Sequence, residues 1–276
     1  MLRRDAADLA PGDAWAATLD WTDLVVHRVA SIDDARFAAA YELLWGEFGA
    51  QNEMEQRAVI ASRLAWHPTR PVGGCALLYE LLVVERDGEI VALRDHTAIL
   101  PLDDPSAPVV VHLSHALVMP PARRGGLGAW LRALPLACAR ECGAEAGAAG
   151  RRVVLVAEME PADPVIAERM ARLRIYGRAG FRCVDPDHIA YHQPDFRPPA
   201  DIDTSGVEPV PLTLVVRRVG CEDEHVMPAS EVRAVVRALY AMYGAHQRPG
   251  DMTPLWERHA ALPDGDEQIP LLAPLS

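Results

Sequence analysis

One glycine-rich turn in this chain has the residue types that bind anions. An aliphatic run ending at Leu117 and Val118 leads into Arg123-Arg124-Gly125-Gly126-Leu127-Gly128-Ala129, and a helical pattern follows from Trp130. Glycines allow positive φ and let the backbone come close to a ligand. The first N–H groups of a helix have no internal partners and lie at the positive end of its dipole. We therefore expect this glycine-rich turn (residues 123–129) to hold a pyrophosphate.

Two common phosphate-binding motifs fit the turn badly. A P-loop requires Lys and then Ser or Thr after its last glycine, but Gly128 is followed by Ala129 and Trp130. A Rossmann fingerprint requires G-x-G-x-x-G with an acidic residue about twenty positions further on. The glycine spacing here differs, and Glu145 lies inside a helical pattern. The turn therefore belongs to another class of anion site.

The pattern that fits is R-x-x-G-x-G, formed by residues 123–128 after Val118-Met119-Pro120. It resembles the acetyl-CoA-binding motif of the GNAT N-acyltransferase superfamily. Further along, residues 176–181 are similar to the family's Tyr-x-x-x-Gly-Phe segment, with Tyr176, Gly180 and Phe181 at the matching positions. The resemblance covers roughly residues 25–220 and implies acetyl-CoA as the acyl donor.

The resemblance also implies roles for these residues. Backbone N–H groups of the turn would bind the CoA diphosphate, and the strand before it would pair with the pantetheine arm. Tyr176 would lie near the CoA sulfur, where a phenol with a pKa near 10 can protonate the leaving thiolate. The cofactor-binding residues implied in this way are Leu117, Val118, Arg123, Arg124, Gly125, Gly126, Leu127, Gly128 and Ala129.

A general base must take the proton from the acceptor amine. Glu158 and Glu160 alternate with Met159 near a strand end, so both carboxylates should point to one face. Substrates of α/β proteins usually bind at such an edge. We favour Glu158, because it lies deeper in the strand. His112 and His115 on the preceding strand are alternatives, and an ordered water could also serve.

The acceptor pocket is expected near Tyr191 and Gln193, in the long loop after a short strand at 181–184. No Ser-His-Asp order is evident in the sequence. We expect no metal, because the pattern does not place His112 and His115 on one face of a strand, and the five cysteines lack paired ligand spacing.

The composition of the chain indicates which classes of partner and which compartment to expect. The 276 residues carry a net charge of −12, which argues against nucleic acid and suits a cationic amine. All 27 basic residues are Arg, so the protein cannot acetylate a lysine of its own. The unpaired cysteine pattern predicts a reducing cytoplasm. The chain has no membrane-length apolar run, and its first twenty residues lack a signal-peptide core.

Hydrophobic periodicity predicts an α+β or α/β fold, and the GNAT resemblance implies a mixed central sheet flanked by helices. An Asp87-Gly88 turn indicates a hairpin, and Ser31 is a candidate N-cap. Segment 186–211 is expected to be a long loop, and the tail from Gln247 to be irregular. Strands are expected at 25–29, 75–85, 90–100, 109–119, 152–160, 181–184 and 212–219, and helices at 32–48, 54–66, 127–146, 164–179 and 230–243.

We expect three regions: a lead-in segment (1–22), a GNAT-like acyltransferase domain (23–222), and an extension with an extra C-terminal helix (223–276). The leading hypothesis is direct transfer of an acetyl group from acetyl-CoA to a primary amine of a small molecule, without nucleic acid or membrane partners. A homodimer is a further expectation. Alternatives are a longer acyl-CoA or acyl-carrier donor, a protein N-terminus as acceptor, and a non-catalytic CoA-binding or interaction module.

Overall fold

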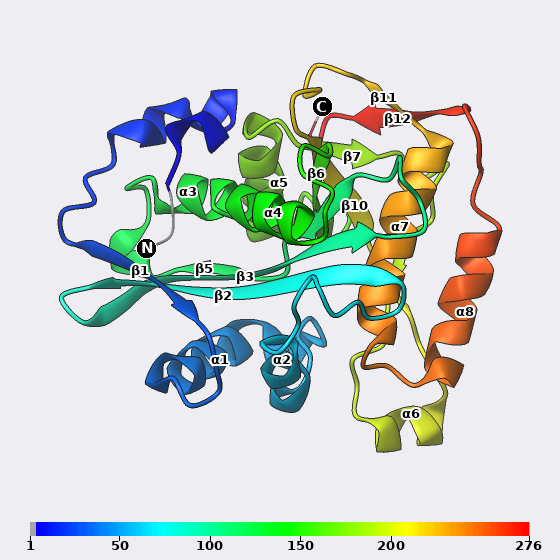
Figure 1. Cartoon of the computed structure of the whole chain (residues 1–276), viewed down its shortest axis with the longest axis horizontal. Coiled ribbons are helices and arrows are strands. Elements are labelled where there is room, and N and C mark those ends of the chain that lie inside the picture. Colours follow the sequence, from blue (N-terminus) through cyan, green and yellow to red (C-terminus); the bar gives the residue numbers. More distant parts are fainter. Residues whose placement is uncertain (1–3, 276) are drawn as a thin grey trace.

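A computed structural model describes residues 4–275, with one large mixed sheet covered by helices on both faces (Figure 1). The sheet contains β1 (Leu24–Val29), β2 (Cys75–Arg86), β3 (Glu89–Pro101), β4 (Val109–His112), β5 (Ala116–Val118), β6 (Val153–Met159), β7 (Arg182–Val184), β10 (Thr213–Arg218), β11 (Val226–Pro228) and β12 (Gln268–Leu272). Its order is β1-β2-β3-β4-β6-β10-β7-β12-β11, and β5 pairs with β3. The short strands β8 (His192–Gln193) and β9 (Val210–Pro211) pair separately.

The helices are α1 (Ala35–Phe48), α2 (Arg57–Arg63), α3 (Leu127–Ala133), α4 (Pro135–Glu145), α5 (Ala167–Arg178), α6 (Pro199–Ser205), α7 (Ala229–Gly244) and α8 (Pro249–Ala260). Strand alternation sorts the sheet residues into two cores. Ala76 and Leu78 of β2 pack on the side of α4 and α5, whereas Leu77 packs on the side of α7 and Leu81 on the side of α1. The predicted mixed sheet with flanking helices is therefore confirmed.

The long β2–β3 hairpin forms at the predicted turn. Asp87 and Gly88 both have positive φ, at 52° and 83°, as a two-residue turn between twisted strands requires. Pairing then continues from Arg86↔Glu89 to Cys75↔Pro101. β2 and β3 are the longest strands of the sheet, and their side chains contribute to the cores on both of its faces.

The single strand predicted at 109–119 is wrong, because residues 113–115 leave the ladder. β4 pairs in parallel with β6 only from Val109↔Val153 to His112↔Val156. β5 pairs instead with β3, where Ala92 lies opposite Val118. The two parallel strands therefore separate beyond Leu113, whose N–H still bonds to the Val156 carbonyl at 2.7 Å. The alternation of side chains along one strand therefore cannot be used to assign faces beyond this break.

Several helix boundaries also differ from the expectations. Asp34, rather than Ser31, caps α1 by accepting from the Arg36 N–H. The helix predicted at 127–146 is divided at Pro135, which has no N–H to continue the ladder. The loop predicted at 186–211 contains α6, and the tail expected to be irregular forms α8 and β12. The 223–276 extension shares its core with the sheet, through Met227, Val232 and Ile269 among others.

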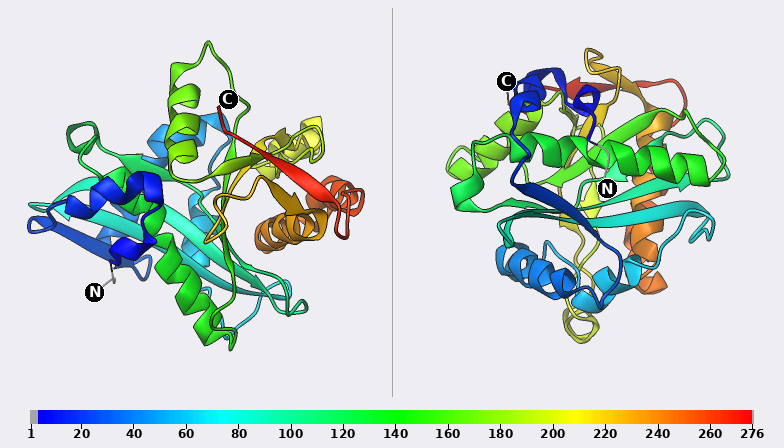
Figure 2. Two further views of the ribbon diagram at one scale, coloured as in Figure 1. Left: turned by 90° about the horizontal axis from the view of Figure 1, so that it is seen from above. Right: turned by 60° about the vertical axis from the view of Figure 1, so that its left-hand side comes forward.

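The lead-in segment packs on α3 as the short 3-10 helices η1 (Ala6–Asp8) and η2 (Pro11–Thr18) (Figure 2). Asp13 forms a buried ion pair with Arg132 at 2.7 Å, and the Trp130 indole donates to the Ala16 carbonyl at 2.9 Å. Gly12 passes so close to the Arg178 carbonyl that a side chain there would collide with it. The segment is thus fixed between α3 and α5.

None of the described helices has the length and apolar character needed to cross a membrane.

Candidate active site

A cavity of about 270 Å³ opens where β4 and β6 separate. Its walls come from the α1–α2 connection, the ends of these strands, α5, the β8–β9 region and α7. A larger cavity of about 660 Å³ lies beside α5 and β7, but the predicted residues Glu158, Glu160 and Gln193 line the smaller one. This 270 Å³ cavity is the candidate active site. Its ionisable lining residues are Glu53, Glu55, His112, His115, Glu158, Glu160, Arg169, Arg172 and Tyr243.

Glu158 is the buried carboxylate of this cavity. It accepts hydrogen bonds from His112 Nε2 at 2.7 Å, from the Tyr243 hydroxyl at 2.5 Å, and from the Tyr191 hydroxyl. Burial alone would raise the Glu158 pKa, but the adjacent His112 ring and these hydrogen bonds lower it below its ordinary value. Glu158 is therefore ionised at neutral pH and acts as an acceptor toward all three groups.

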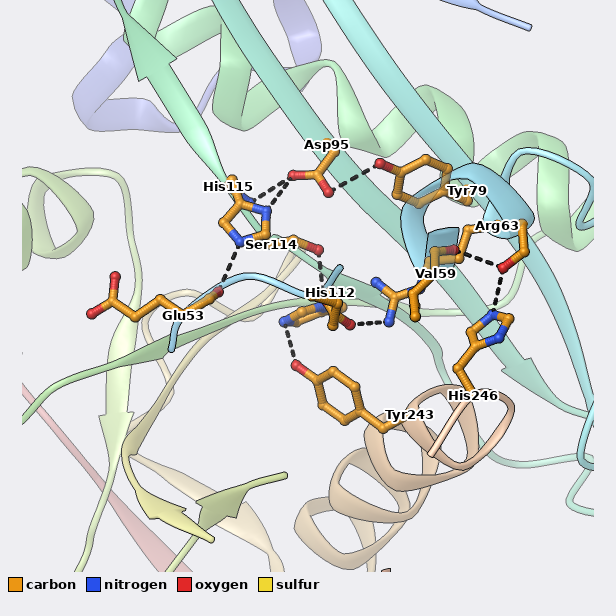
Figure 3. Close-up of polar contacts among 12 residues, drawn as sticks. Glu53, Val59, Arg63, Tyr79, Asp95, His112, Ser114, His115, Tyr243 and His246 are labelled. Atoms are coloured by element: carbon orange, nitrogen blue, oxygen red, sulfur yellow. Dashed lines mark hydrogen bonds and ion pairs between the residues drawn. The ribbon is translucent and has the colours of Figure 1, made fainter. Parts of the chain in front are cut away.

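This arrangement fixes the tautomer of His112. Because ionised Glu158 can only accept, His112 Nε2 must carry the hydrogen, and in the neutral ring Nδ1 is then an acceptor. Ser114 Oγ lies 3.1 Å from that Nδ1, so the serine hydroxyl donates to it (Figure 3). All three residues line the cavity, and Ser114 is only half-buried. A hydrogen-bonded chain thus runs from the cavity through Ser114 and His112 to Glu158.

A second carboxylate–imidazole pair lies on the β3 side of the cavity. His115 Nδ1 is 2.9 Å from Asp95, and its Nε2 contacts the Glu53 carbonyl at 2.9 Å (Figure 3). Burial would lower the His115 pKa, but the Asp95 charge and hydrogen bonds raise it to about 9. His115 is therefore cationic at neutral pH and poorly suited to accept a proton.

The predicted pair Glu158 and Glu160 does line the same cavity. Glu160 differs in its surroundings, because it is paired with Arg169 at 3.0 Å and Arg172 at 3.3 Å. His112 and His115 both line this one cavity, although the alternation of an unbroken strand would place residues three positions apart on opposite faces. The break at 113–115 is the reason, since it turns the strand between them.

Glu53 is a cavity residue that the sequence analysis did not identify. Burial, followed by the like charge of Glu160, raises the pKa of its carboxyl. Among residues 4–275, Glu53 has no ion-pair partner. Its position in an irregular α1–α2 connection gives no periodic signal that would have singled it out.

The two predicted acceptor-pocket residues lie close to this chain of groups. The Tyr191 ring is buried and its hydroxyl donates to Glu158. Gln193 lines the cavity and donates from Nε2 to the Asn52 carbonyl at 3.1 Å. Ser114 and Tyr243 complete the site. In the sequence, only the closeness of Ser114 to His112, two positions away, could have indicated Ser114 as a site residue.

The glycine-rich turn lies on the other face of the sheet, with α3. Arg124 and Gly126 have positive φ, at 68° and 97°, which directs the backbone into the helix start. Residues 123–125 are exposed, whereas η2 covers part of the turn, with Trp15 and Ala16 near Gly126. The backbone N–H groups of residues 124–128 have no hydrogen-bond acceptor within the described chain. They remain able to bind an anion.

Tyr176 lies on α5, on the α3 side of the sheet. Its ring packs edge-on against Phe181, with 4.8 Å between centroids, and the Arg132 guanidinium lies 5.8 Å from its centre. It does not line the 270 Å³ cavity. Its assignment to the CoA sulfur stays a prediction.

No protein-family model matches the sequence, and no curated protein matches it. The structure is similar to a putative GNAT-family acetyltransferase from Desulfovibrio desulfuricans, with 17% identity, 71% of this chain and 99% of that chain covered, and a TM-score of 0.40. A GNAT-family acetyltransferase from Elizabethkingia anophelis with acetyl-CoA bound has 14% identity, the same coverage and a TM-score of 0.41.

A tandem GNAT protein from the clavulanic acid biosynthesis pathway matches with 21% identity and a TM-score of 0.38, over 62% of this chain. The match spans less than half of that protein, 46% of its chain. The structural neighbours are thus GNAT-family acetyltransferases at low sequence identity.

Proposed function

We propose that this protein transfers an acetyl group from acetyl-CoA to a primary amine of a small molecule by direct attack of the amine on the thioester. The observation that carries the proposal is that β4 and β6 separate between the glycine-rich turn and the 270 Å³ cavity. The glycine-rich turn lies with α3 on one face of the sheet, and the chain of Ser114, His112 and Glu158 lines the cavity that opens where the strands separate.

The turn supports the donor half of the proposal. Its unpaired N–H groups, the start of α3 and the exposed Arg123 and Arg124 suit a pyrophosphate. Between the turn and β4, the β5 edge facing the gap has backbone groups that an extended amide-containing arm could pair with, as an added strand does. A CoA thioester has both features.

The chain of Ser114, His112 and Glu158 supports the acceptor half. The neutral amine attacks the thioester carbonyl, so that a C–N bond forms, the C–S bond breaks and CoA leaves as its thiolate. The amine nitrogen loses a proton in this step, and a positioned base raises the rate. Ser114 Oγ passes its own proton to His112 Nδ1 while it receives the amine proton. Ionised Glu158 then stabilises the imidazolium through Nε2. In this proposal His112 is the base and Glu158 its positioning residue.

The charges of the cavity favour a cationic acceptor. Glu158 stays negative beside a neutral His112, Glu160 pairs with Arg169 and Arg172, and the Glu53 carboxyl lines the cavity with no ion-paired cation of its own among residues 4–275. An ammonium group would supply that cation on binding. Because an ammonium nitrogen has no lone pair, the bound group gives one proton to solvent before it attacks, and the relay takes the second proton during the attack.

Release of free thiol from acetyl-CoA, measured with a panel of amines, tests the proposal. We expect amine-dependent release and a product that is heavier than the amine by one acetyl group. A donor panel run with the best amine separates acetyl-CoA from longer acyl chains, and a peptide with a free N-terminus tests a protein acceptor. CoA binding without turnover on any acceptor would favour the binding-module alternative.

A second candidate reaction rests on the order Ser114, His112, Glu158, which is that of a serine nucleophile, its base and an orienting carboxylate. Here Ser114 Oγ attacks the thioester, the C–S bond breaks, and the proton passes through His112 to the thiolate. The amine then displaces the serine ester. Intact-mass measurement with acetyl-CoA and no amine separates the two routes: direct attack leaves Ser114 unmodified, whereas the covalent route adds one acetyl group to it.

A further inference from the structure

A second polar cluster lies away from the candidate active site, in the core between the sheet and α4. Glu80 of β2 and His96 of β3 are register partners, and Cys138 of α4 lies above them. The cluster shares its side of the sheet with apolar neighbours such as Leu78 and Ala98. Glu80, His96 and Cys138 are each at most 1% exposed. Three chemically reactive groups are thus enclosed in a core where aliphatic residues would be expected.

The hydrogen-bonding capacity of the cluster is left largely unused. No well-aligned hydrogen bond reaches either ring nitrogen of His96 or Glu80 Oε2 among the described residues, and the only polar contact of these atoms is the one that His96 Nε2 and Glu80 Oε2 make with each other. Glu80 Oε1 is accounted for, because it accepts from Arg28. A buried polar group without a partner costs free energy, so such groups in native proteins usually have an acceptor, a donor or an ion.

The open atoms point at one another. His96 Nε2 lies 3.3 Å from Glu80 Oε2, and one ligand atom each from Glu80, His96 and Cys138 lie within 4.8 Å of one another. Zinc binds imidazole and carboxylate at about 2.0 Å and thiolate at about 2.3 Å, so two ligands of one ion stand a little over 3 Å apart. The Glu80–His96 separation already meets this value, and Cys138 needs only a small inward movement.

From this geometry we propose that Glu80, His96 and Cys138 form a zinc site that ties α4 to the β2–β3 hairpin. The ion would be held by one oxygen, one nitrogen and one sulfur, a donor set that suits Zn²⁺. The carboxylate and the thiolate balance its two charges. The thiol proton leaves on binding, and the ion replaces the solvation that burial denies to the thiolate.

A partly exposed ion pair adjoins the cluster through Arg28. Arg28 also pairs with Glu141 of α4, and these two side chains are 36% and 45% exposed. They therefore form the boundary between the buried cluster and solvent. A fourth ligand position on that side would be open to water. The three ligands are far apart in the sequence, so no short metal-ligand motif would have predicted the site.

Cobalt titration of chelator-treated protein tests the proposal, because Co²⁺ bound to a thiolate gives a charge-transfer band in the near ultraviolet. We expect the band to saturate at one Co²⁺ per chain and to be displaced by Zn²⁺. Cys138→Ala should abolish the band and the rise in Tm that Zn²⁺ produces. Cys142→Ala is the matched control: this thiol lies one turn further along α4, is equally buried, and should leave both signals unchanged.

Absence of the band in the unmodified chain would overturn the proposal. So would a band that survives in Cys138→Ala, which would indicate adventitious metal only, or one lost in Cys142→Ala but not in Cys138→Ala. Circular dichroism of both metal-free variants separates loss of a ligand from loss of the fold. None of these readouts depends on acyl transfer.

Discussion

His112 Nε2 lies 2.7 Å from the Glu158 carboxylate, although the two residues are 46 positions apart in the sequence. They come from neighbouring parallel strands and meet just where those strands separate. The contact fixes which imidazole nitrogen can accept a proton. It also places that nitrogen next to Ser114, on the cavity side.

Replacing His112 should remove the base without removing the donor site. We expect His112→Gln to lower kcat by roughly 100-fold or more, the usual contribution of a positioned base. The KM for acetyl-CoA should stay nearly constant. His188→Gln is the control, since this exposed histidine pairs with Asp185 outside the cavity. An unchanged kcat in correctly folded His112→Gln would exclude the relay.

Glu158→Gln should destabilise the fold as well as slow the reaction. The carboxylate accepts from three donors, whereas the amide offers one oxygen and brings an NH₂ group of its own. Leaving buried donors unsatisfied should cost about 3 kcal/mol of unfolding free energy. Urea denaturation measures the loss. Tyr243→Phe removes one donor only and should cost less; equal losses would contradict the shared-acceptor geometry.

Glu53→Gln tests the choice of a cationic acceptor. If the Glu53 carboxylate attracts the ammonium group, losing about 1.4 kcal/mol of that attraction raises the KM for the amine about tenfold. The KM for acetyl-CoA should not change. Glu47→Gln on the exposed side of α1 controls for net charge. A KM for the amine that is the same in all three proteins would remove Glu53 from the acceptor site.

The Asp95–His115 pair predicts how stability depends on pH. The pKa of His115 is about 9 in the folded state and near 6.5 in the unfolded state. The charged pair therefore makes its full contribution to the free energy of unfolding below pH 6.5. That contribution should fall as pH rises toward 9, by roughly 3 kcal/mol in all. Asp95→Asn should be less stable at pH 6 and lose less between pH 6.5 and 9.5. Parallel curves for the two proteins would show that another group titrates.

Much of the sheet could be predicted because local signals determine it. Asp87-Gly88 marks the hairpin turn, and the apolar runs on either side of it mark the two strands. Local signals fail at residues 113–115, because the apolar composition continues through the point where the chain leaves one strand and begins the next. They fail again at β12, where a proline within the strand and acidic residues before it hid five residues that complete the sheet.

The candidate site could be predicted only in part, for a related reason. Glu158, Tyr191 and Gln193 stood out by residue type and position, and all three lie at or beside the cavity. Ser114, Glu53 and Tyr243 became visible only when the break in β4, the α1–α2 connection and α7 were brought together. Tertiary contacts of this kind leave no periodic pattern in any one segment.

The most direct test of the account is calorimetric titration of the protein with CoA. The unmodified chain should bind one CoA, and Gly125→Asp should bind it roughly 100-fold more weakly, because a carboxylate would stand beside the pyrophosphate. A Cβ at Gly125 meets only the Ala122 carbonyl, at 3.7 Å, so the fold should tolerate the change. Gly250→Asp on α8 adds the same charge in open space and should bind like the unmodified chain. No CoA binding by the unmodified chain, or equal affinity in Gly125→Asp, would contradict the account.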